Sequence, residues 1–175
     1  MKKMVLSLLL LLGGCAVTPP SGVTPITDFE LDRYLGKWYE IARLDHPFER
    51  GLSNVSATYS PREDGGVKVV NRGYNDRAGV WKEAEGRAYF LGESSVGSLK
   101  VSFFGPFYGG YHIIALDRAN YSYAMISGPN RDYLWVLARD RELSPPVLKD
   151  LLEQARALGF ATDQLIVIEQ DREDA

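Results

Sequence analysis

The sequence predicts an all-β domain followed by a single α-helix. Eight short segments rich in β-branched and aromatic residues are separated by turns that contain glycine, proline, asparagine or aspartate. A later segment instead carries its leucines at helical spacing. Eight short strands at even spacing form either an up-and-down barrel or a sandwich, and the spacing alone leaves both open.

Composition narrows the class of protein. The chain has 175 residues, enough for one domain with a substantial core. Its net charge of −3 comes from evenly mixed charges, which argues against nucleic acid as a partner because such proteins need a basic face. Two histidines and one cysteine are too few for a metal cluster of the usual ligand spacing, so we expect no metal and no cofactor.

The chain begins with a targeting segment, predicted to span residues 1–14. Lysines at positions 2 and 3 precede an apolar run, residues 5–12, that is too short to cross a membrane. The run ends in Leu12-Gly13-Gly14-Cys15, which resembles the lipobox of bacterial lipoproteins. That resemblance implies cleavage before Cys15 and attachment of lipid to its sulfur. The alternative is an ordinary secretion signal with an incidental cysteine.

Lipidation of Cys15 implies a membrane anchor. Acyl chains contribute about 0.8 kcal/mol per buried CH₂, so several chains hold a protein durably. By analogy with other bacterial lipoproteins, Ala16 in place of an aspartate favours the outer membrane, with the domain facing the periplasm. Residues 15–27 are rich in proline and predict an extended, mobile tether.

A short helical leader precedes the first strand. Asp28 is suited to cap a turn in which Leu31 and Leu35 share one face. Gly36 accepts backbone angles that other residues resist, so we expect the turn to end there and a strand to cover residues 36–43.

A loop at residues 45–51 follows, in which we expect His46 to be a solvated side chain rather than a ligand or an acid. Residues 105–110 are expected to form a turn with exposed aromatic side chains. The other seven strands are predicted at residues 55–59, 67–72, 80–91, 98–104, 111–116, 121–127 and 133–139.

The C-terminal part carries the helix. Ser144 is expected to cap it, followed by prolines in the first turn, and Gly159 is expected to end it. Its apolar residues share one face, which predicts packing against the outside of the sheet. A short strand is predicted at residues 164–168, then a frayed charged tail from Glu169, disordered over 171–175.

Three motifs resemble the signatures of the lipocalin family. They are Gly36-Lys37-Trp38, the stretch 116–124 with its aspartate-bearing turn and Tyr123-Ala124, and the strand ending in Arg139. The resemblance covers residues 28–170 and is closest to the bacterial lipocalins, a group of outer-membrane lipoproteins. It implies an eight-stranded antiparallel up-and-down barrel with the helix outside. It also implies that Arg139 lies over Trp38 as a cation–π pair at the closed end.

Strand alternation, anchored on Trp38 and Arg139, predicts the side chains inside the barrel. It places Glu40 and Ala42 inside, with Glu40 near the closed end and held by tyrosine hydroxyls or Arg139. For the other strands, the match to the lipocalin pattern implies which residues face inward; it places Ala115 inside and His112 on the outer face, and we expect the tyrosine hydroxyls near the mouth. The predicted ligand-binding residues are Ala57, Tyr59, Val69, Asn71, Ala88, Phe90, Val101, Phe103, Tyr111, Ile113, Tyr133 and Trp135.

The lipocalin resemblance implies a hollow barrel that carries a fatty acid or a lysophospholipid, with a role in membrane maintenance under stress. Alternation alone cannot separate a hollow barrel from a filled one. A lipid-processing enzyme on the same barrel, using Glu40, His46 or tyrosines, is the alternative function. The aromatic residues Phe104, Phe107 and Tyr108 form a patch that contacts a membrane, joins a homodimer or packs within the loop.

Overall fold

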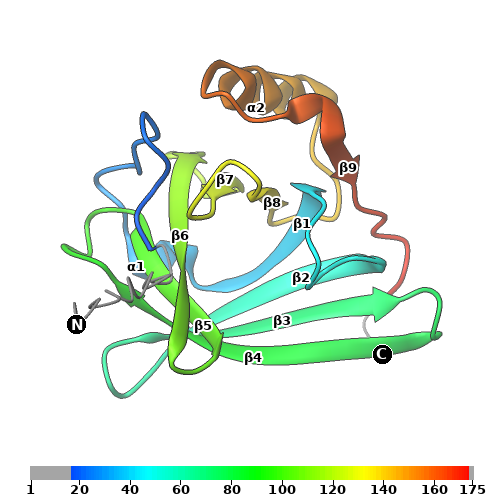
Figure 1. The fold of residues 1–175 in the computed structure, drawn as a ribbon, viewed down its shortest axis with the longest axis horizontal. Coiled ribbons are helices and arrows are strands. Elements are labelled where there is room, and N and C mark those ends of the chain that lie inside the picture. The colour runs from blue at the N-terminus through cyan, green and yellow to red at the C-terminus, as the bar shows by residue number, and fades with distance from the viewer. Residues whose placement is uncertain (1–16, 174–175) are drawn as a thin grey trace, which may run out of the picture.

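A computed structural model describes residues 17–173, which form a closed β-barrel with one helix outside it (Figure 1). No helix among these residues is long and apolar enough to span a membrane. The short helix α1 covers Leu31–Tyr34 and the outer helix α2 covers Pro145–Ala157. The strands are β1 Gly36–Leu44, β2 Leu52–Pro61, β3 Val67–Asn75, β4 Val80–Phe90, β5 Ser98–Phe104, β6 Phe107–Leu116, β7 Tyr123–Ser127, β8 Leu134–Ala138 and β9 Leu165–Val167.

The strands run up and down in chain order, and β1 closes the barrel by pairing with both β8 and β2. Tyr39 lies opposite Ala138 on one edge of β1, and Gly36 lies opposite Tyr59 on the other. The predicted barrel is therefore confirmed over the sandwich. The second half of β1 pairs with β9, which occupies the edge that β2 leaves free.

Two apolar clusters follow from the alternation of the strands. One lies inside the barrel and includes Trp38 and Ile113, both fully buried. The other lies between the barrel wall and α2, where Leu151 and Ala155 of the helix pack against Val136 and its neighbours. The helix therefore packs on the outside, as predicted. Gly159, with φ of +86°, follows it.

β-Bulges shift the alternation in two strands. A register shift in β1 between Glu40 and Ala42 turns Ala42 outward, into the cluster under α2. A second shift, after Ile113 in β6, does the same to Ala115. The predictions that Ala42 and Ala115 face inward were wrong, because an extra residue in a bulge reverses the facing of every residue after it.

Some element boundaries also differ from the prediction. Glu30, without a capping hydrogen bond from its side chain, holds the N-cap position of the leader helix; Asp28, with φ of +52°, lies in the connection before it. Strand β6 begins at Phe107, so residues 107–110 belong to a hairpin rather than to a wide turn. Tyr121, with φ of +54°, lies in the preceding turn, and β7 therefore starts at Tyr123.

The described part of the expected tether, residues 17–27, lies against the barrel. Val23 is buried, Ser21 accepts a hydrogen bond from Arg131 (2.6 Å), and the Ile26 amide donates to the Ile113 carbonyl (2.9 Å). This differs from the extended, mobile segment that the prolines predict. The predicted signal peptide and Cys15 lie outside the described residues.

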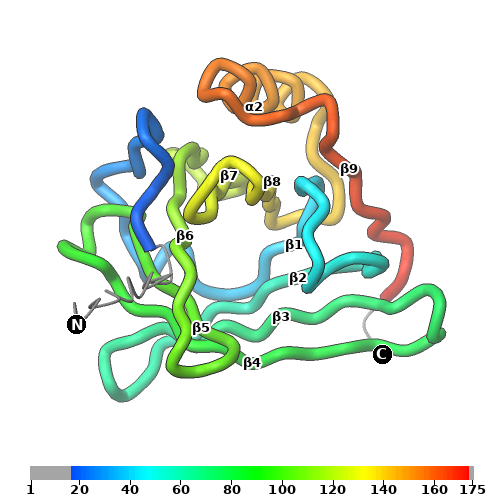
Figure 2. The backbone as a smooth tube through the Cα atoms, viewed as in Figure 1, coloured from blue at the N-terminus to red at the C-terminus, as the bar shows by residue number. Residues whose placement is uncertain are grey.

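The C-terminal segment is bound as well, along the path that Figure 2 shows from β9 past β2. The Gln170 amide donates to the carbonyls of Glu40 (2.9 Å) and Val55 (2.8 Å), and so bridges β1 and β2 where they do not pair. Asn54 donates to the carboxylate of Asp171 and accepts from the Arg172 amide. Residues 170–172 are thus held to the barrel rather than frayed.

Candidate ligand-binding pocket

A pocket lies inside the barrel, and the atom-free space in it and at its mouth, open solvent included, is about 880 Å³. The turn that carries α1 closes one end. Phe48 and Glu49 of the β1–β2 loop line the other end, which we call the mouth. The walls of the pocket are almost entirely apolar. The lining residues are Phe29, Leu31, Tyr34, Glu40, Phe48, Glu49, Val55, Ser56, Ala57, Tyr59, Val67, Val69, Asn71, Ala88, Leu99, Val101, Phe103, Gly110, Tyr111, Trp135 and Leu137.

Most of the predicted ligand-binding residues line this space, because they alternate along strands whose inner face is the pocket wall. Those that line it are Ala57, Tyr59, Val69, Asn71, Ala88, Val101, Phe103, Tyr111 and Trp135. Phe90 and Ile113 do not line it, although they pack in the same apolar cluster inside the barrel. Tyr133 lies at the mouth, stacked on Trp135 with ring centroids 6.0 Å apart.

Strand alternation missed lining residues that lie outside the strands. Phe29, Leu31 and Tyr34 come from the leader, and Phe48 and Glu49 come from the mouth loop. Leu31 was placed on the apolar face of the leader, but nothing in the sequence shows that this face forms the floor of a pocket.

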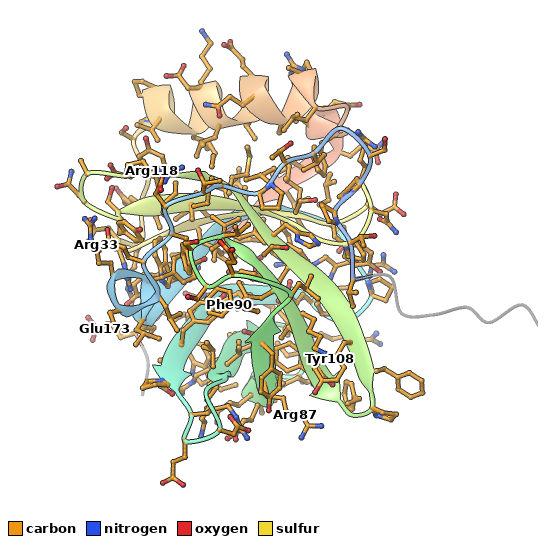
Figure 3. The ribbon with its side chains drawn as sticks, turned by 90° about the vertical axis from the view of Figure 1, so that its left-hand side faces the viewer. Arg33, Arg87, Phe90, Tyr108, Arg118 and Glu173 are labelled. Carbon is orange, nitrogen blue, oxygen red and sulfur yellow. The ribbon has the colours of Figure 1, made fainter. Side chains whose placement is uncertain are left out.

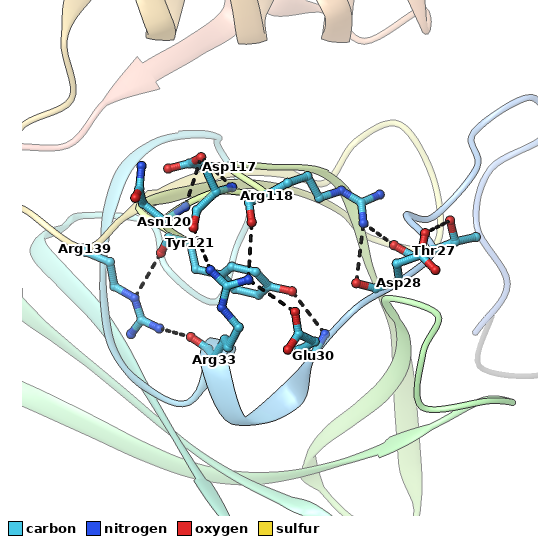
Figure 4. A network of polar contacts seen from close by, with 10 residues as sticks. Thr27, Asp28, Glu30, Arg33, Asp117, Arg118, Asn120, Tyr121 and Arg139 are labelled. Atoms are coloured by element: carbon cyan, nitrogen blue, oxygen red, sulfur yellow. Dashed lines mark hydrogen bonds and ion pairs between the residues drawn. The ribbon is translucent and has the colours of Figure 1, made fainter.

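The closed end is held by the predicted pair. The Arg139 guanidinium lies 4.0 Å from the centroid of the Trp38 ring. The same group donates to the carbonyls of Lys37 (3.0 Å), Arg33 (2.7 Å) and Tyr121 (3.3 Å). One side chain therefore ties α1, β1 and the β6–β7 turn together, as Figure 4 shows for Arg33 and Tyr121.

The β6–β7 turn is organised by Asp117. Its carboxylate accepts hydrogen bonds from the Ser122 hydroxyl (2.5 Å) and from the amides of Ala119 and Asn120. These donors stabilise the charged form and lower the pKa of Asp117. Next to it, the Tyr121 hydroxyl accepts a hydrogen bond from the Glu30 amide, which fixes the start of α1 (Figure 4).

Three tyrosine hydroxyls form a chain above Trp38. Tyr111 lies 2.7 Å from Tyr34 and 2.8 Å from Tyr59, measured between hydroxyl oxygens. Burial raises the pKa of all three, so they are neutral donors and acceptors that satisfy one another. The prediction of tyrosine hydroxyls near the mouth was wrong for Tyr59 and Tyr111, because their hydrogen-bonded chain ends at Tyr34 of α1, at the closed end.

A cluster of ionisable side chains lies in the wall toward the mouth. The Arg43 guanidinium contacts the Glu40 carboxylate at 2.6 Å and donates to the Glu49 carbonyl at 2.8 Å. The Glu49 carboxylate in turn contacts His46 Nε2 at 2.9 Å and accepts from the Trp135 indole at 3.0 Å. These four ionisable side chains are each at least 94% buried.

Two expectations are corrected here. Glu40 does lie inside, but its partner is Arg43, which the β1 bulge turns inward. His46 is 2% exposed and stacks on Phe48 with centroids 3.9 Å apart, so it is not a solvated loop side chain.

The pKa of Glu40 is raised well above its ordinary value. Burial is the first cause and the neighbouring Glu49 carboxyl is the second, and together they outweigh the attraction of Arg43. The pocket therefore has an apolar interior and a mouth side that carries two carboxyl groups beside aromatic rings.

His112 lies on the outer face of β6, as predicted, but is fully buried there. Its Nδ1 lies 3.0 Å from the Ser98 hydroxyl. Burial lowers its pKa and keeps the ring neutral. Among residues 17–173, no group of three or more His, Cys, Asp or Glu is arranged to hold a metal ion.

Comparison with known proteins agrees with this geometry. A family model described as a lipocalin-like domain matches residues 29–170. Outer membrane lipoprotein Blc of Vibrio cholerae is 57% identical over 160 residues, covering 91% of this chain and 93% of that protein. Outer membrane lipoprotein Blc of Escherichia coli K12 is 54% identical over 153 residues, covering 87% and 86%.

A solved structure shows the same fold at low identity. Insecticyanin from Manduca sexta superimposes with a TM-score of 0.70 at 22% identity, covering 89% of each chain. The family match spans the three motifs, the barrel and the outer helix, and the predicted resemblance is confirmed. The chain belongs to the lipocalin family.

Proposed function

We propose that the protein binds one single-chain lipid, a fatty acid or a lysophospholipid, with its acyl chain in the barrel pocket. The observation that carries the proposal is an apolar pocket that is closed by Trp38 and Arg139 at one end and open at the other. Burial of an acyl chain contributes on the order of 10 kcal/mol at about 0.8 per CH₂, less the cost of immobilising it. Binding is reversible and has no covalent step.

The mouth side of the pocket favours one of the two lipids. A free fatty acid would bring a third carboxyl group toward Glu40 and Glu49, and Arg43, the cation beside them, is already paired with Glu40. An ammonium head group would instead be attracted by these carboxyl groups and by the faces of Phe48 and Trp135. We therefore expect a lysophospholipid with an ammonium head group to bind more tightly than a fatty acid of equal chain length.

The proposal includes an anchor. Lipidation of Cys15 would hold the domain on the outer membrane, facing the periplasm. The lipobox resemblance supports this, as do the names of the Vibrio cholerae and Escherichia coli relatives, which are outer membrane lipoproteins.

The pocket is tested by filling it. Ala57→Trp places an indole in the lining, so lysophospholipid affinity should fall at least about tenfold, the equivalent of 1.4 kcal/mol. Thr58→Trp is the matched control, because the neighbouring residue on β2 is not part of the lining. Affinity is measured by calorimetric titration, with circular dichroism to check folding. Unchanged affinity in a folded Ala57→Trp protein would refute the pocket.

A further inference from the structure

The tip of the β5–β6 hairpin, residues 104–107, is the most exposed apolar feature among the described residues. Phe104 is 80% exposed and Phe107 is 67% exposed, and the two lie opposite each other across the turn. Paired exposed phenylalanines at the end of a hairpin are unfavourable in water and are typical of surfaces that contact something apolar.

Basic and amphipathic side chains flank this hairpin tip. Arg87 Nε donates to the Tyr108 hydroxyl at 3.0 Å, and Lys100 Nζ lies 4.9 Å from the centroid of the same ring. Figure 3 shows Arg87 and Tyr108 beside the turn. Aromatic rings with arginine and lysine next to them suit the interface of a bilayer, where the rings enter the head-group region and the cations meet phosphates.

The covalent chain places the expected anchor near the hairpin tip. The carbonyl of Val17 packs against β6 at Gly110, where an added Cβ would lie 2.8 Å from it. Cys15 precedes Val17 by two residues, so it lies within about 7 Å of Val17. Gly110 and Phe107 are three residues apart on one strand, which is about 10 Å. A lipid on Cys15 would therefore bring a membrane to the same side as Phe107.

The hairpin tip also lies at the end of the barrel where the pocket opens. In an up-and-down barrel the β5–β6 turn and the β1–β2 loop share one end, and Phe103, next to the tip, lines the pocket. We propose that the hairpin tip inserts into the bilayer that holds the anchor, so that the pocket mouth faces the membrane surface. This proposal rests on the lipidation of Cys15 in the proposed function.

The test uses the full chain, processed by its host and reconstituted in vesicles of phosphatidylethanolamine and phosphatidylglycerol. Phe107→Cys is labelled with an environment-sensitive fluorophore, since lipidation leaves no other free thiol in the chain. Glu63→Cys, exposed in the β2–β3 turn at the opposite end of the barrel, is the matched control. Vesicles with nitroxide groups on their acyl chains then report which label enters the bilayer. Circular dichroism confirms that both variants are folded.

We expect the nitroxide lipids to quench most of the emission of the label at position 107. The emission of the label at position 63 should be unchanged. Equal emission at both positions in a lipidated protein would overturn the inference and leave lipid binding in the pocket untouched. Air oxidation of unlabelled Phe107→Cys protein to disulfide-linked pairs, together with no quenching of the labelled protein, would instead assign the tip to a second copy, and would also overturn the inference. Mass spectrometry of the protein reports lipidation separately, and an unmodified Cys15 would refute the anchor and this proposal together.

Discussion

Glu40 and Arg43 form an ion pair inside the barrel, where neither charge is exposed to water. The pair is three residues apart on β1 and lies on one side of the strand only because of the bulge between Glu40 and Ala42. Removing one partner of a buried pair leaves the other charge without compensation, which costs more than the pair contributes.

Above the raised pKa of Glu40, Arg43→Met is expected to lower the free energy of unfolding by about 3–5 kcal/mol, because the charged Glu40 carboxylate loses its partner. The double variant Arg43→Met with Glu40→Gln should be more stable than Arg43→Met alone, since no unpaired charge remains. Urea unfolding of the two single variants and the double variant measures the difference. Additive effects of the two substitutions would show that they do not interact.

The raised pKa of Glu40 predicts a pH dependence of stability. A carboxyl whose pKa is higher in the folded state binds more protons there, so stability is lost as the pH rises from the ordinary glutamate value of about 4.3 through the raised value. Glu40→Gln should remove this decline, which a series of urea unfolding curves at increasing pH measures. An equally steep decline in Glu40→Gln would assign it to another group.

For individual residues, the sequence predicted the side-chain pairs that belong to a motif. It missed the side-chain pairs that form only because of a β-bulge. Arg139 over Trp38 and the inward position of Glu40 are confirmed. The partner of Glu40 was missed, because strict alternation puts Arg43 outside. The burial of His46 was missed too, because it depends on how Phe48 and the mouth loop fold back over the pocket.

The C-terminal segment, which the sequence predicted to be frayed, helps to close the barrel. β1 pairs with β2 only from Gly36 to Tyr39, and beyond this point β9 and the C-terminal segment occupy its edge. Gln170 donates to one carbonyl from each strand, which satisfies backbone groups that the missing ladder leaves free. The segment therefore completes the wall of the barrel.

Gln170→Ala is expected to lower the free energy of unfolding by about 1–3 kcal/mol, since two carbonyls lose their donor. Glu169→Ala is the control, because only the backbone of this exposed residue contacts the barrel, through the Asn54 amide. Chemical unfolding of both variants provides the comparison. Equal stability of the two would mean that the bridge contributes nothing.

The strands and the helix were predictable from their apolar residues, which recur at every second position in the strands and at every third or fourth position in the helix. The predicted ends of strands were wrong where the side-chain type does not determine the backbone conformation. Tyr121 favours a strand by type but has a positive φ in the turn, and Phe107 lies beyond a turn whose glycines predicted a longer loop. The docking of residues 17–27 depends on contacts with β6 and Arg131 that no local pattern reveals.

The whole molecule is a barrel with one closed end, one open end and a wall of mostly apolar side chains. The closed barrel was predictable from the three motifs, since they mark strands that must meet at Trp38. Whether the barrel is hollow was not, because inward-facing residues fill a core or line a pocket equally well. Small side chains such as Ala57 and Ala88 leave the space that the structure contains.

The central claim is that this space holds a lipid. Native mass spectrometry of the chain from Ala16 onward, titrated with a lysophospholipid and with a fatty acid of equal chain length, tests it most directly. We expect a one-to-one complex with intact lipid and a larger bound fraction for the lysophospholipid. Conversion of the lipid to a product would favour an enzyme, and the absence of any complex would contradict the claim that the pocket binds lipid.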